Sequence, residues 1–394
     1  MTKPTHPIYL DNAAATPVDP AVLEVMQKYF DQEYANPSAL YGLGRQARAA
    51  IDDARATIAN SLAAKPTEIV FTSCATESNN LAIQGVLRAH PGSHWVTTAI
   101  EHDSVLALEQ PMSAAGHPLS VVPVSADGIV DAQDVAEAVT DTTVLVSVML
   151  ANNEIGTIQP LTEVAKRLVA IRASRTARGI DRPLYLHTDA AQAAAYINLH
   201  VNRLGVHLLT LNGSKMYGPK GAGVLYVRTG TIMNPLMYGG GQERGRRSGT
   251  ENVPAIVGLG AAVKLAAAHR QAESARLEQL RGQLARQILE ALPGTSLNGH
   301  PRKRLPGNLN FTIPDAEGET LVLHLDQAGI QVSTGSACSI GNQEASHVLT
   351  SIGCTADQAR TSLRLTLGRQ TTAADIAYVA KTLPAVVAAV RNLG

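Results

Sequence analysis

The middle of the chain repeats one pattern of apolar and polar positions. A short apolar run rich in β-formers ends in a polar cluster, and a helical pattern often follows it. Continuous apolar strands that alternate with helices predict an α/β fold with a mostly parallel sheet covered on both faces. The predicted strands cover residues 68–73, 94–100, 143–150, 183–187 and 206–211.

The polar clusters stand at the carboxyl ends of these predicted strands. In a sheet of this kind, ligands bind in the crevice outside those ends. The clusters hold unusual polar side chains, such as EHDS after the second run, ANNEIG after the third and NGSKMYGPKGAG after the fifth. We therefore expect one functional site along this edge.

The last third of the chain predicts a smaller α/β unit. The Ala/Leu/Arg/Gln-rich segment 255–292 has no internal proline and predicts a long helix that bridges two domains. A strand, a helix and a second strand are predicted after it, at residues 308–313, 320–327 and 362–367. We predict a large domain of residues 14–262 and a small domain of residues 1–13 and 263–394.

Composition limits the class of protein. The 394 residues include 33 Lys or Arg, 33 Asp or Glu and three cysteines, so the formal net charge is zero. This balance argues against a direct nucleic-acid partner, whose binding needs a cationic surface. Three cysteines are too few for a disulfide framework and indicate a reducing compartment. No apolar run has the length of a signal peptide or a membrane helix, so we expect a cytoplasmic protein without membrane contact.

Lys215 follows a predicted strand, and Asp189 ends the strand before it. A lone lysine among Gly, Ser and Pro is most often a solvated turn residue. Together with Asp189 and Gln192 it has a second interpretation, because an aldehyde cofactor bound as a Schiff base needs one lysine and a pyridine nitrogen needs one carboxylate. Gln192 could then donate a hydrogen bond to the phenolic oxygen of the ring.

The segment CATES lies between a predicted strand and a predicted helix. Backbone N–H groups at the start of that helix, with the Thr76 and Ser78 hydroxyls, could bind an anion. The alternative is an ordinary helix cap formed by Ser73 or Thr76. Ser214 offers another hydroxyl, and the glycine- and arginine-rich loop 238–250 could bring Thr250 to a phosphate, either within one subunit or across a dimer interface.

Three more residues are candidates on chemical grounds. His102 stands at a strand end, where its ring could stack on a flat cofactor and relay protons. Cys338 lies in STGSACSIG, a composition typical of an exposed loop that suits a thiolate nucleophile. Arg364 lies inside the apolar pattern SLRLTL, where it would either bind a carboxylate or face solvent from a half-buried strand. No pair of cysteines has zinc-ligand spacing, so no metal site is expected.

Eight ordered motifs resemble the NifS/IscS-type (group I) cysteine desulfurases, which depend on pyridoxal 5'-phosphate (PLP) and have the type I fold of PLP-dependent transferases. The resemblance covers about residues 8–370. Its motifs are YLDNAAATP, CATESNNLAI, EHDSVL, NNEIGTIQP, HTDAAQ, GSKMYGPKGAGVLYVR, GGGQERGRRSGTENV and STGSACSIG, followed by SLRLTLGR.

The resemblance implies a mechanism and a role for each residue. Lys215 would hold PLP, Asp189 and Gln192 would bind its ring atoms, and His102 would stack on the ring and assist proton transfer. The phosphate would be bound by Ala75, Thr76, Ser214 and, from a partner subunit, Thr250. Asn153 and Arg364 would bind the carboxylate of L-cysteine. Cys338, in a loop at about 330–345, would attack the substrate sulfur, giving L-alanine and a persulfide for a sulfur-acceptor protein.

The sequence departs from the usual family pattern at a few positions. Ser214 stands where His is common, Asn212 where Ser is usual, and Cys74 where Gly is usual, so Cys74 would be strained if its φ were positive. Two related enzyme classes remain as alternatives, a selenocysteine lyase and a cysteine sulfinate desulfinase. A non-catalytic relay protein of the same fold is a third possibility.

Overall fold

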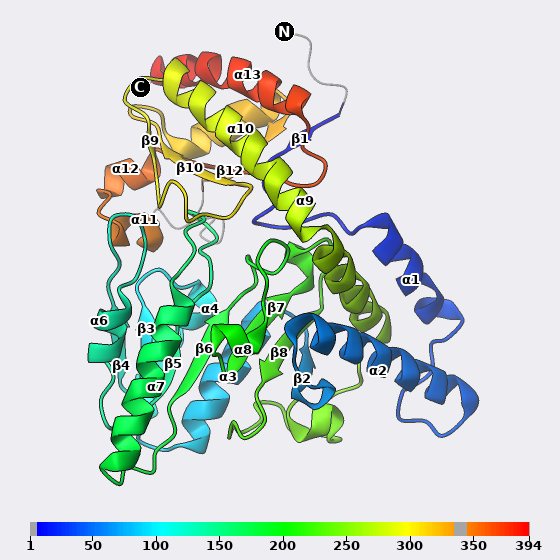
Figure 1. Ribbon diagram of the computed structural model, residues 1–394. Coiled ribbons are helices and arrows are strands. Elements are labelled where there is room, and N and C mark those ends of the chain that lie inside the picture. Colours follow the sequence, from blue (N-terminus) through cyan, green and yellow to red (C-terminus); the bar gives the residue numbers. More distant parts are fainter. Residues whose placement is uncertain (1–5, 335–344, 394) are drawn as a thin grey trace.

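The computed structural model describes residues 6–334 and 345–393 and contains a large mixed sheet (Figure 1). The strand order is β2-β8-β7-β6-β5-β3-β4. Neighbours from β7 to β4 are parallel, and β8 is antiparallel to both β7 and β2. The strands are β2 (Ile69–Thr72), β3 (His94–Thr98), β4 (Leu119–Val122), β5 (Thr143–Ser147), β6 (Tyr185–Asp189), β7 (Leu208–Asn212) and β8 (Gly223–Val227). All five strands predicted for this sheet are present.

Helices cover both faces of this sheet, because successive strand residues point to opposite faces and both sets are apolar. Leu145 and Leu208 pack with α3, α4 and α5 on one face. Val146 and Leu209 pack with α1, α2, α6, α7, α8 and the first part of α9 on the other. The helices are α1 (Pro20–Asp31), α2 (Gly42–Leu62), α3 (Ala75–Ala89), α4 (Asp103–Leu106), α5 (Glu109–Ala114), α6 (Ala132–Glu137), α7 (Leu161–Ala177) and α8 (Val201–Leu204).

A second, smaller core surrounds an antiparallel sheet in the order β12-β10-β9. The N-terminal strand β1 joins this unit by pairing in parallel with β11. The elements of this unit are β1 (Ile8–Tyr9), β9 (Ser296–Leu297), β10 (Asn308–Thr312), α10 (Gly318–Gln327), β11 (Ile330–Gln331), α11 (His347–Ser351), α12 (Ala356–Arg360), β12 (Ser362–Thr366) and α13 (Ala373–Arg391).

The predicted bridging helix is α9 (Val253–Ala291), which passes from the lower unit into the upper one in Figure 1. Its 39 residues span about 58 Å at 1.5 Å per residue. Leu259 packs into the core of the large sheet, and Leu277 and Leu284 pack into the core of the small one. One continuous helix therefore sets the spacing of the two cores.

Helix α13 is long and apolar enough to cross a membrane by length and composition alone. It packs on the small sheet through Ile376, Val379, Leu383 and Val387, all fully buried. This stripe accounts for its apolar character as a core helix.

A buried acid, Glu101, lies just after β3. Its Oε1 accepts hydrogen bonds from Thr98 Oγ1 and from the backbone N–H of Met149, both at 2.8 Å. Among the described residues, Oε2 has no hydrogen-bond partner. Burial raises the pKa of Glu101 to about 8, and the nearby charge of Asp189 adds to the rise. The carboxyl group is therefore mostly protonated at neutral pH.

This protonation gives a stability prediction. An ordinary glutamate in the unfolded chain releases its proton near pH 4.5, whereas folded Glu101 keeps it up to about pH 8. The folded state thus binds more protons between these values, and its stability falls as the pH rises, by about 1.4 kcal/mol per pH unit from this group. In Glu101→Gln, which cannot ionise, this slope should disappear from denaturant unfolding measured at pH 5, 6, 7 and 8. Parallel curves for the two proteins would refute the assignment.

Candidate active site

Lys215 and Asp189 lie at the carboxyl ends of two neighbouring parallel strands. Asp189 is the last residue of β6 and is paired with Thr210 of β7. Lys215 closes the 3-10 turn Gly213–Lys215, which begins directly after β7. Since adjacent parallel strands end at the same edge, the fold brings these two predicted residues to one side of the sheet.

The turn before Lys215 depends on local chemistry. Asn212 caps it, because its Oδ1 accepts from the Ser214 backbone N–H at 3.4 Å and also from the Ser214 hydroxyl at 3.3 Å. At Gly213 an added Cβ would lie 2.7 Å from the carbonyl oxygen of Pro219, so only glycine fits the close return of the chain. The Ser214 hydroxyl therefore lies beside Asn212, the residue that stands where the family usually has serine.

The N-terminal arm, residues 6–19, contacts the predicted cofactor residues. The sequence did not indicate these contacts. Lys215 Nζ donates to the carbonyl oxygens of Ala13, at 2.8 Å, and Ala14. Gln192 Nε2 donates to the same Ala13 oxygen at 2.9 Å. Lys215 and Gln192 therefore meet at one carbonyl group of the arm.

Asp189 begins a chain of hydrogen bonds that ends at His102. Its Oδ2 accepts from Asn79 Nδ2 at 2.6 Å, and Asn79 Nδ2 also donates to Ser104 Oγ at 2.8 Å. Ser104 donates its backbone N–H to His102 Nδ1 at 3.0 Å. Asn79 and Ser104 were not singled out as site residues, although both lie inside the motifs CATESNN and EHDS.

The contact with Ser104 also orients His102. His102 is the N-cap of α4, and its ring nitrogen Nδ1 accepts the capping hydrogen bond. A neutral His102 therefore carries its proton on Nε2, because Nδ1 is used as an acceptor. The side chain presents a fixed tautomer at the strand edge.

The predicted anion site lies at the start of α3, where Ala75 and Thr76 form the first turn. The N–H groups of such a turn have no acceptor within the helix, so they are available to an anion. Cys74 precedes the helix with φ −171°, which is extended backbone and carries no strain. The backbone of Cys74 passes close to Gly223 of β8, where an added Cβ would lie 2.9 Å from Cys74 Cα. Glycine is therefore needed at position 223 and not at position 74.

Two expectations about this helix start are corrected. Ser78 is fully buried and its hydroxyl lies 2.7 Å from Thr72 Oγ1, so it belongs to the interior and not to an anion site. The cap residue is Cys74, without a side-chain hydrogen bond, and not Ser73 or Thr76. Glu77 Oε2 accepts a hydrogen bond from the Ser73 backbone N–H at 2.7 Å. Thr76 is exposed.

The glycine- and arginine-rich loop is tied to helix α2 by a buried ion pair. Arg55 of α2 donates to Glu243 through both guanidinium ends, at 2.6 and 2.9 Å. Arg247 donates to Glu77 of α3 at 2.8 Å. Burial alone would raise the pKa of Glu77, but the hydrogen bonds from Arg247 and Ser73 hold it below its usual value. Thr250 remains exposed on this loop.

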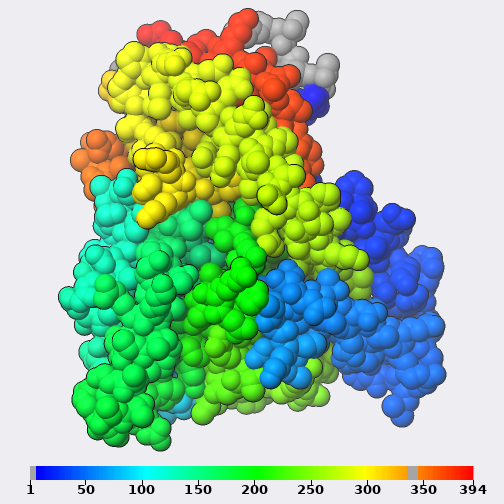
Figure 2. Space-filling view, viewed as in Figure 1, coloured from blue at the N-terminus to red at the C-terminus, as the bar shows by residue number. Residues whose placement is uncertain are grey.

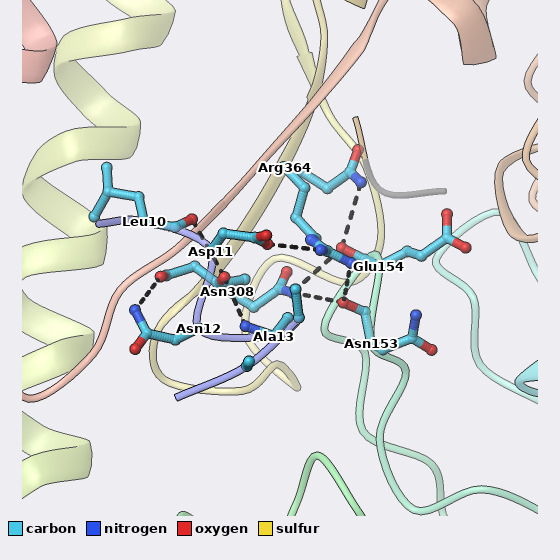
Figure 3. A network of polar contacts seen from close by, with 12 residues as sticks. Leu10, Asp11, Asn12, Ala13, Asn153, Glu154, Asn308 and Arg364 are labelled. Carbon is cyan, nitrogen blue, oxygen red and sulfur yellow. Dashed lines mark hydrogen bonds and ion pairs between the residues drawn. The ribbon is translucent and has the colours of Figure 1, made fainter. Parts of the chain in front are cut away.

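Arg364 lies at the centre of β12 and is only 2% exposed, so the alternative of a solvent-facing arginine is wrong. Its Nη2 lies 2.8 Å from Asp11 Oδ1, and its Nη1 donates to the Asn153 carbonyl oxygen at 3.3 Å. Figure 3 shows the arm, the loop of Asn153 and Glu154, and β12 converging on this guanidinium. The two predicted carboxylate-binding residues, Asn153 and Arg364, are thus adjacent.

Cys338 lies outside the described residues, but the segments on either side of it are anchored. Ser362 Oγ donates to the Thr334 carbonyl oxygen at 2.9 Å, and Ser346 Oγ donates to Glu154 Oε2 at 2.6 Å. The other two cysteines are half-buried, and burial raises the pKa of Cys354, which disfavours a thiolate there. No three His, Cys, Asp or Glu side chains of the described residues are grouped to hold a metal ion.

Comparisons with known proteins identify the family of the chain. A family model described as aminotransferase class-V matches residues 8–379. The chain is 42% identical to cysteine desulfurase IscS of Dictyoglomus turgidum over 388 residues, which cover 98% of this chain and 96% of that protein. A solved NifS-like protein superposes with a TM-score of 0.88 at 33% identity, covering 97% of this chain and 99% of that one. A structure titled SspA in complex with cysteine gives a TM-score of 0.79 at 36% identity, covering 93% and 99%. The predicted type I fold is thereby confirmed, and the chain belongs to the aminotransferase class-V family.

Proposed function

We propose that the chain is a PLP-dependent cysteine desulfurase that converts L-cysteine to L-alanine and leaves a persulfide on Cys338. The observation that carries this proposal is the placement of Lys215 and Asp189 at the carboxyl ends of two neighbouring strands, in a fold shared with cysteine desulfurases. The names of the relatives favour this activity over a selenocysteine lyase or a cysteine sulfinate desulfinase.

The chemistry of the described residues fits PLP. The Asp189 carboxylate is buried and accepts two hydrogen bonds, from Asn79 Nδ2 at 2.6 Å and from the Ala191 backbone N–H at 2.9 Å. Its oxygens can accept about four hydrogen bonds in total, so they can take a further one from a protonated pyridine nitrogen. Lys215 offers the amine that an aldehyde requires, and the start of α3 offers N–H groups for a phosphate.

Each residue then has one task toward the cofactor. Asp189 would keep the ring nitrogen protonated, Gln192 would bind the phenolic oxygen, and His102 would stack on the ring and move protons through Nε2. The phosphate would be held by Ala75, Thr76, Ser214 and Thr250 of the partner subunit. When bound, PLP supplies an electron sink that stabilises negative charge at the substrate Cα and so weakens its Cβ–S bond.

Substrate binding and sulfur transfer fall to three residues. Arg364 and Asn153 would bind the carboxylate of L-cysteine, and the Cys338 thiolate would attack the substrate sulfur. A new S–S bond forms as the Cβ–S bond breaks, and the bonding electrons return to the substrate carbon, which is protonated to give L-alanine. The persulfide sulfur would then pass to an acceptor protein in iron–sulfur cluster assembly or thiolation.

The organisation of the whole molecule is part of the proposal. The two separate cores support a division into a large domain of residues 14–262 and a small domain of residues 1–13 and 263–394. We propose a cytoplasmic location, where a reducing environment keeps Cys338 as a free thiol. No membrane or direct nucleic-acid partner is proposed.

A homodimer would explain the exposed apolar side chains around α1 and α2, which form the projecting blue lobe in Figure 2. Leu40 is 89% exposed, and Phe30, Tyr34 and Tyr41 are also exposed. Tyr238, at the start of the glycine- and arginine-rich loop, is 80% exposed. Large apolar surfaces of this kind mark protein interfaces. Such a dimer would also give the exposed Thr250 a partner site.

The first prediction concerns the cofactor lysine. Purified protein reconstituted with PLP should be yellow, and borohydride reduction followed by mass spectrometry should find the cofactor on Lys215. Lys215→Ala should lose this covalent link, whereas Lys220→Ala, which removes an exposed lysine nearby, should keep it. A label on another lysine would overturn the assignment.

The second prediction concerns the nucleophile. Cys338→Ala should release L-alanine from L-cysteine at least about 100-fold more slowly, because removing a nucleophile forfeits the covalent step. Cys74→Ala and Cys354→Ala should keep most of the activity, and mass spectrometry of the wild type should find one extra sulfur on Cys338. Alanine release by Cys338→Ala at the wild-type rate would refute the persulfide mechanism.

The third prediction concerns assembly. Light scattering coupled to size exclusion should give a dimer for the wild type, and Leu40→Asp should shift it toward a monomer that retains PLP less well. Leu323→Asp changes a leucine that is 65% exposed on α10 of the small unit, and this variant should remain dimeric. A monomeric wild type that keeps full activity would contradict the dimer and the role of Thr250.

A further inference from the structure

Arg364 is a full charge inside a sheet, and Asp11 is its ionic partner. The arginine side chain is 3% exposed, the Asp11 side chain is 20% exposed, and Arg364 Nη2 lies 2.8 Å from Asp11 Oδ1. A charge buried to this degree needs a counter-charge to be stable. Asp11 belongs to the N-terminal arm, far from Arg364 in the sequence, so the pair joins two ends of the chain.

The arm holds Asp11 through contacts that do not involve its carboxylate. The backbone of Asp11 forms a parallel bridge with Thr366 of β12. Tyr9 donates its hydroxyl to the carbonyl oxygens of Asp11 and Ala15, at 3.0 and 2.7 Å. Asn12 Nδ2 donates to the Thr366 carbonyl oxygen at 2.8 Å. The backbone of Asp11 is therefore held next to β12 by contacts that are independent of the ion pair.

We propose that Asp11 is a positioning residue that orients the Arg364 guanidinium for the substrate carboxylate. This inference rests on the proposed function and assigns a role that composition and motif spacing did not indicate. A guanidinium donates in a planar fork, and it binds a carboxylate well only when that plane has the right direction. The bond from Nη2 to Asp11 and the bond from Nη1 to the Asn153 carbonyl oxygen set this plane before substrate arrives.

The same stretch of arm also contacts the cofactor residues. Two residues after Asp11, the Ala13 carbonyl oxygen accepts from both Lys215 and Gln192. Asp11 and Ala13 thus fix the carboxylate-binding arginine relative to the cofactor lysine. The α-carboxylate and the α-amine of an amino acid share one carbon, so their binding groups must keep a set distance.

A competing role for Asp11 predicts the opposite change in substrate affinity. If Asp11 only competes with the substrate for Arg364, its removal would strengthen binding. If it orients Arg364, its removal leaves the long side chain to find the productive rotamer on binding, and affinity falls. Whether affinity rises or falls when Asp11 is removed therefore distinguishes a competitor from a positioning residue.

The test uses the PLP-loaded enzyme with Asp11→Asn, which keeps size and removes charge. We expect KM for L-cysteine to rise about five- to ten-fold with kcat within two-fold, because orientation of the guanidinium affects binding more than bond breaking. Asp11→Glu, which restores the charge, should recover part of the loss. The matched control is Asp19→Asn, since Asp19 of the same arm pairs with Arg369 at 2.9 Å at similar exposure; its KM should not change.

A binding measurement removes dependence on turnover. Spectral titration of the PLP-loaded enzyme with L-alanine should show the same weakening in Asp11→Asn, whereas L-alaninamide, which lacks the carboxylate, should bind both proteins equally. Equal losses for both ligands would indicate a general structural defect, and unchanged or tighter L-alanine binding would indicate a competitor. Either result overturns the proposal. A wild type that binds L-alanine but does not consume L-cysteine would instead refute the proposed activity.

Discussion

The buried charge of Arg364 is the constraint on which much of the molecule depends. A guanidinium in the middle of β12 requires a carboxylate, and none is supplied by the strands beside it, so the N-terminal arm crosses to provide Asp11. The pairing of β1 with β11 and the bridge from Asp11 to Thr366 hold the arm on that path. Once there, its carbonyl groups lie against Lys215 and Gln192. The arm is thus a structural link between the two sheets.

A second constraint comes from the parallel sheet. Its carboxyl ends bring together residues from β3, β6 and β7, and a line of hydrogen bonds from Asp189 through Asn79 and Ser104 reaches His102. Buried polar groups need such partners, because an unpaired one costs about 1–3 kcal/mol. Neighbouring Glu101 avoids a buried charge instead, since burial raises its pKa to about 8 and keeps it mostly protonated at neutral pH. The region behind His102 therefore carries less negative charge than its residues suggest.

The sequence predicted the strands and the residues at their ends, because apolar runs and the polar clusters after them are local signals. It could not decide the environment of Arg364, since alternation in SLRLTL fits either face. The role of the arm was hidden as well, because Ala13 acts through its backbone and Asp11 meets Arg364 only in the folded chain. The prediction that Ser78 binds an anion is wrong, because a hydroxyl in the first turn of a helix can point inward as easily as outward. Contacts between distant segments, unlike periodicity, leave no mark in a single sequence.

The segments that flank Cys338 contact Arg364 and the chain neighbours of two other predicted site residues. Ser346 donates to Glu154, the neighbour of Asn153, and His347 Nε2 lies 2.9 Å from the carbonyl oxygen of Glu101, the neighbour of His102. On the other side, the backbone of Ser333 bonds to that of Arg364. The described residues on both sides of Cys338 are therefore held by Arg364 and by the neighbours of Asn153 and His102, so the proposed nucleophile lies in the chain between two anchors close to the predicted substrate residues.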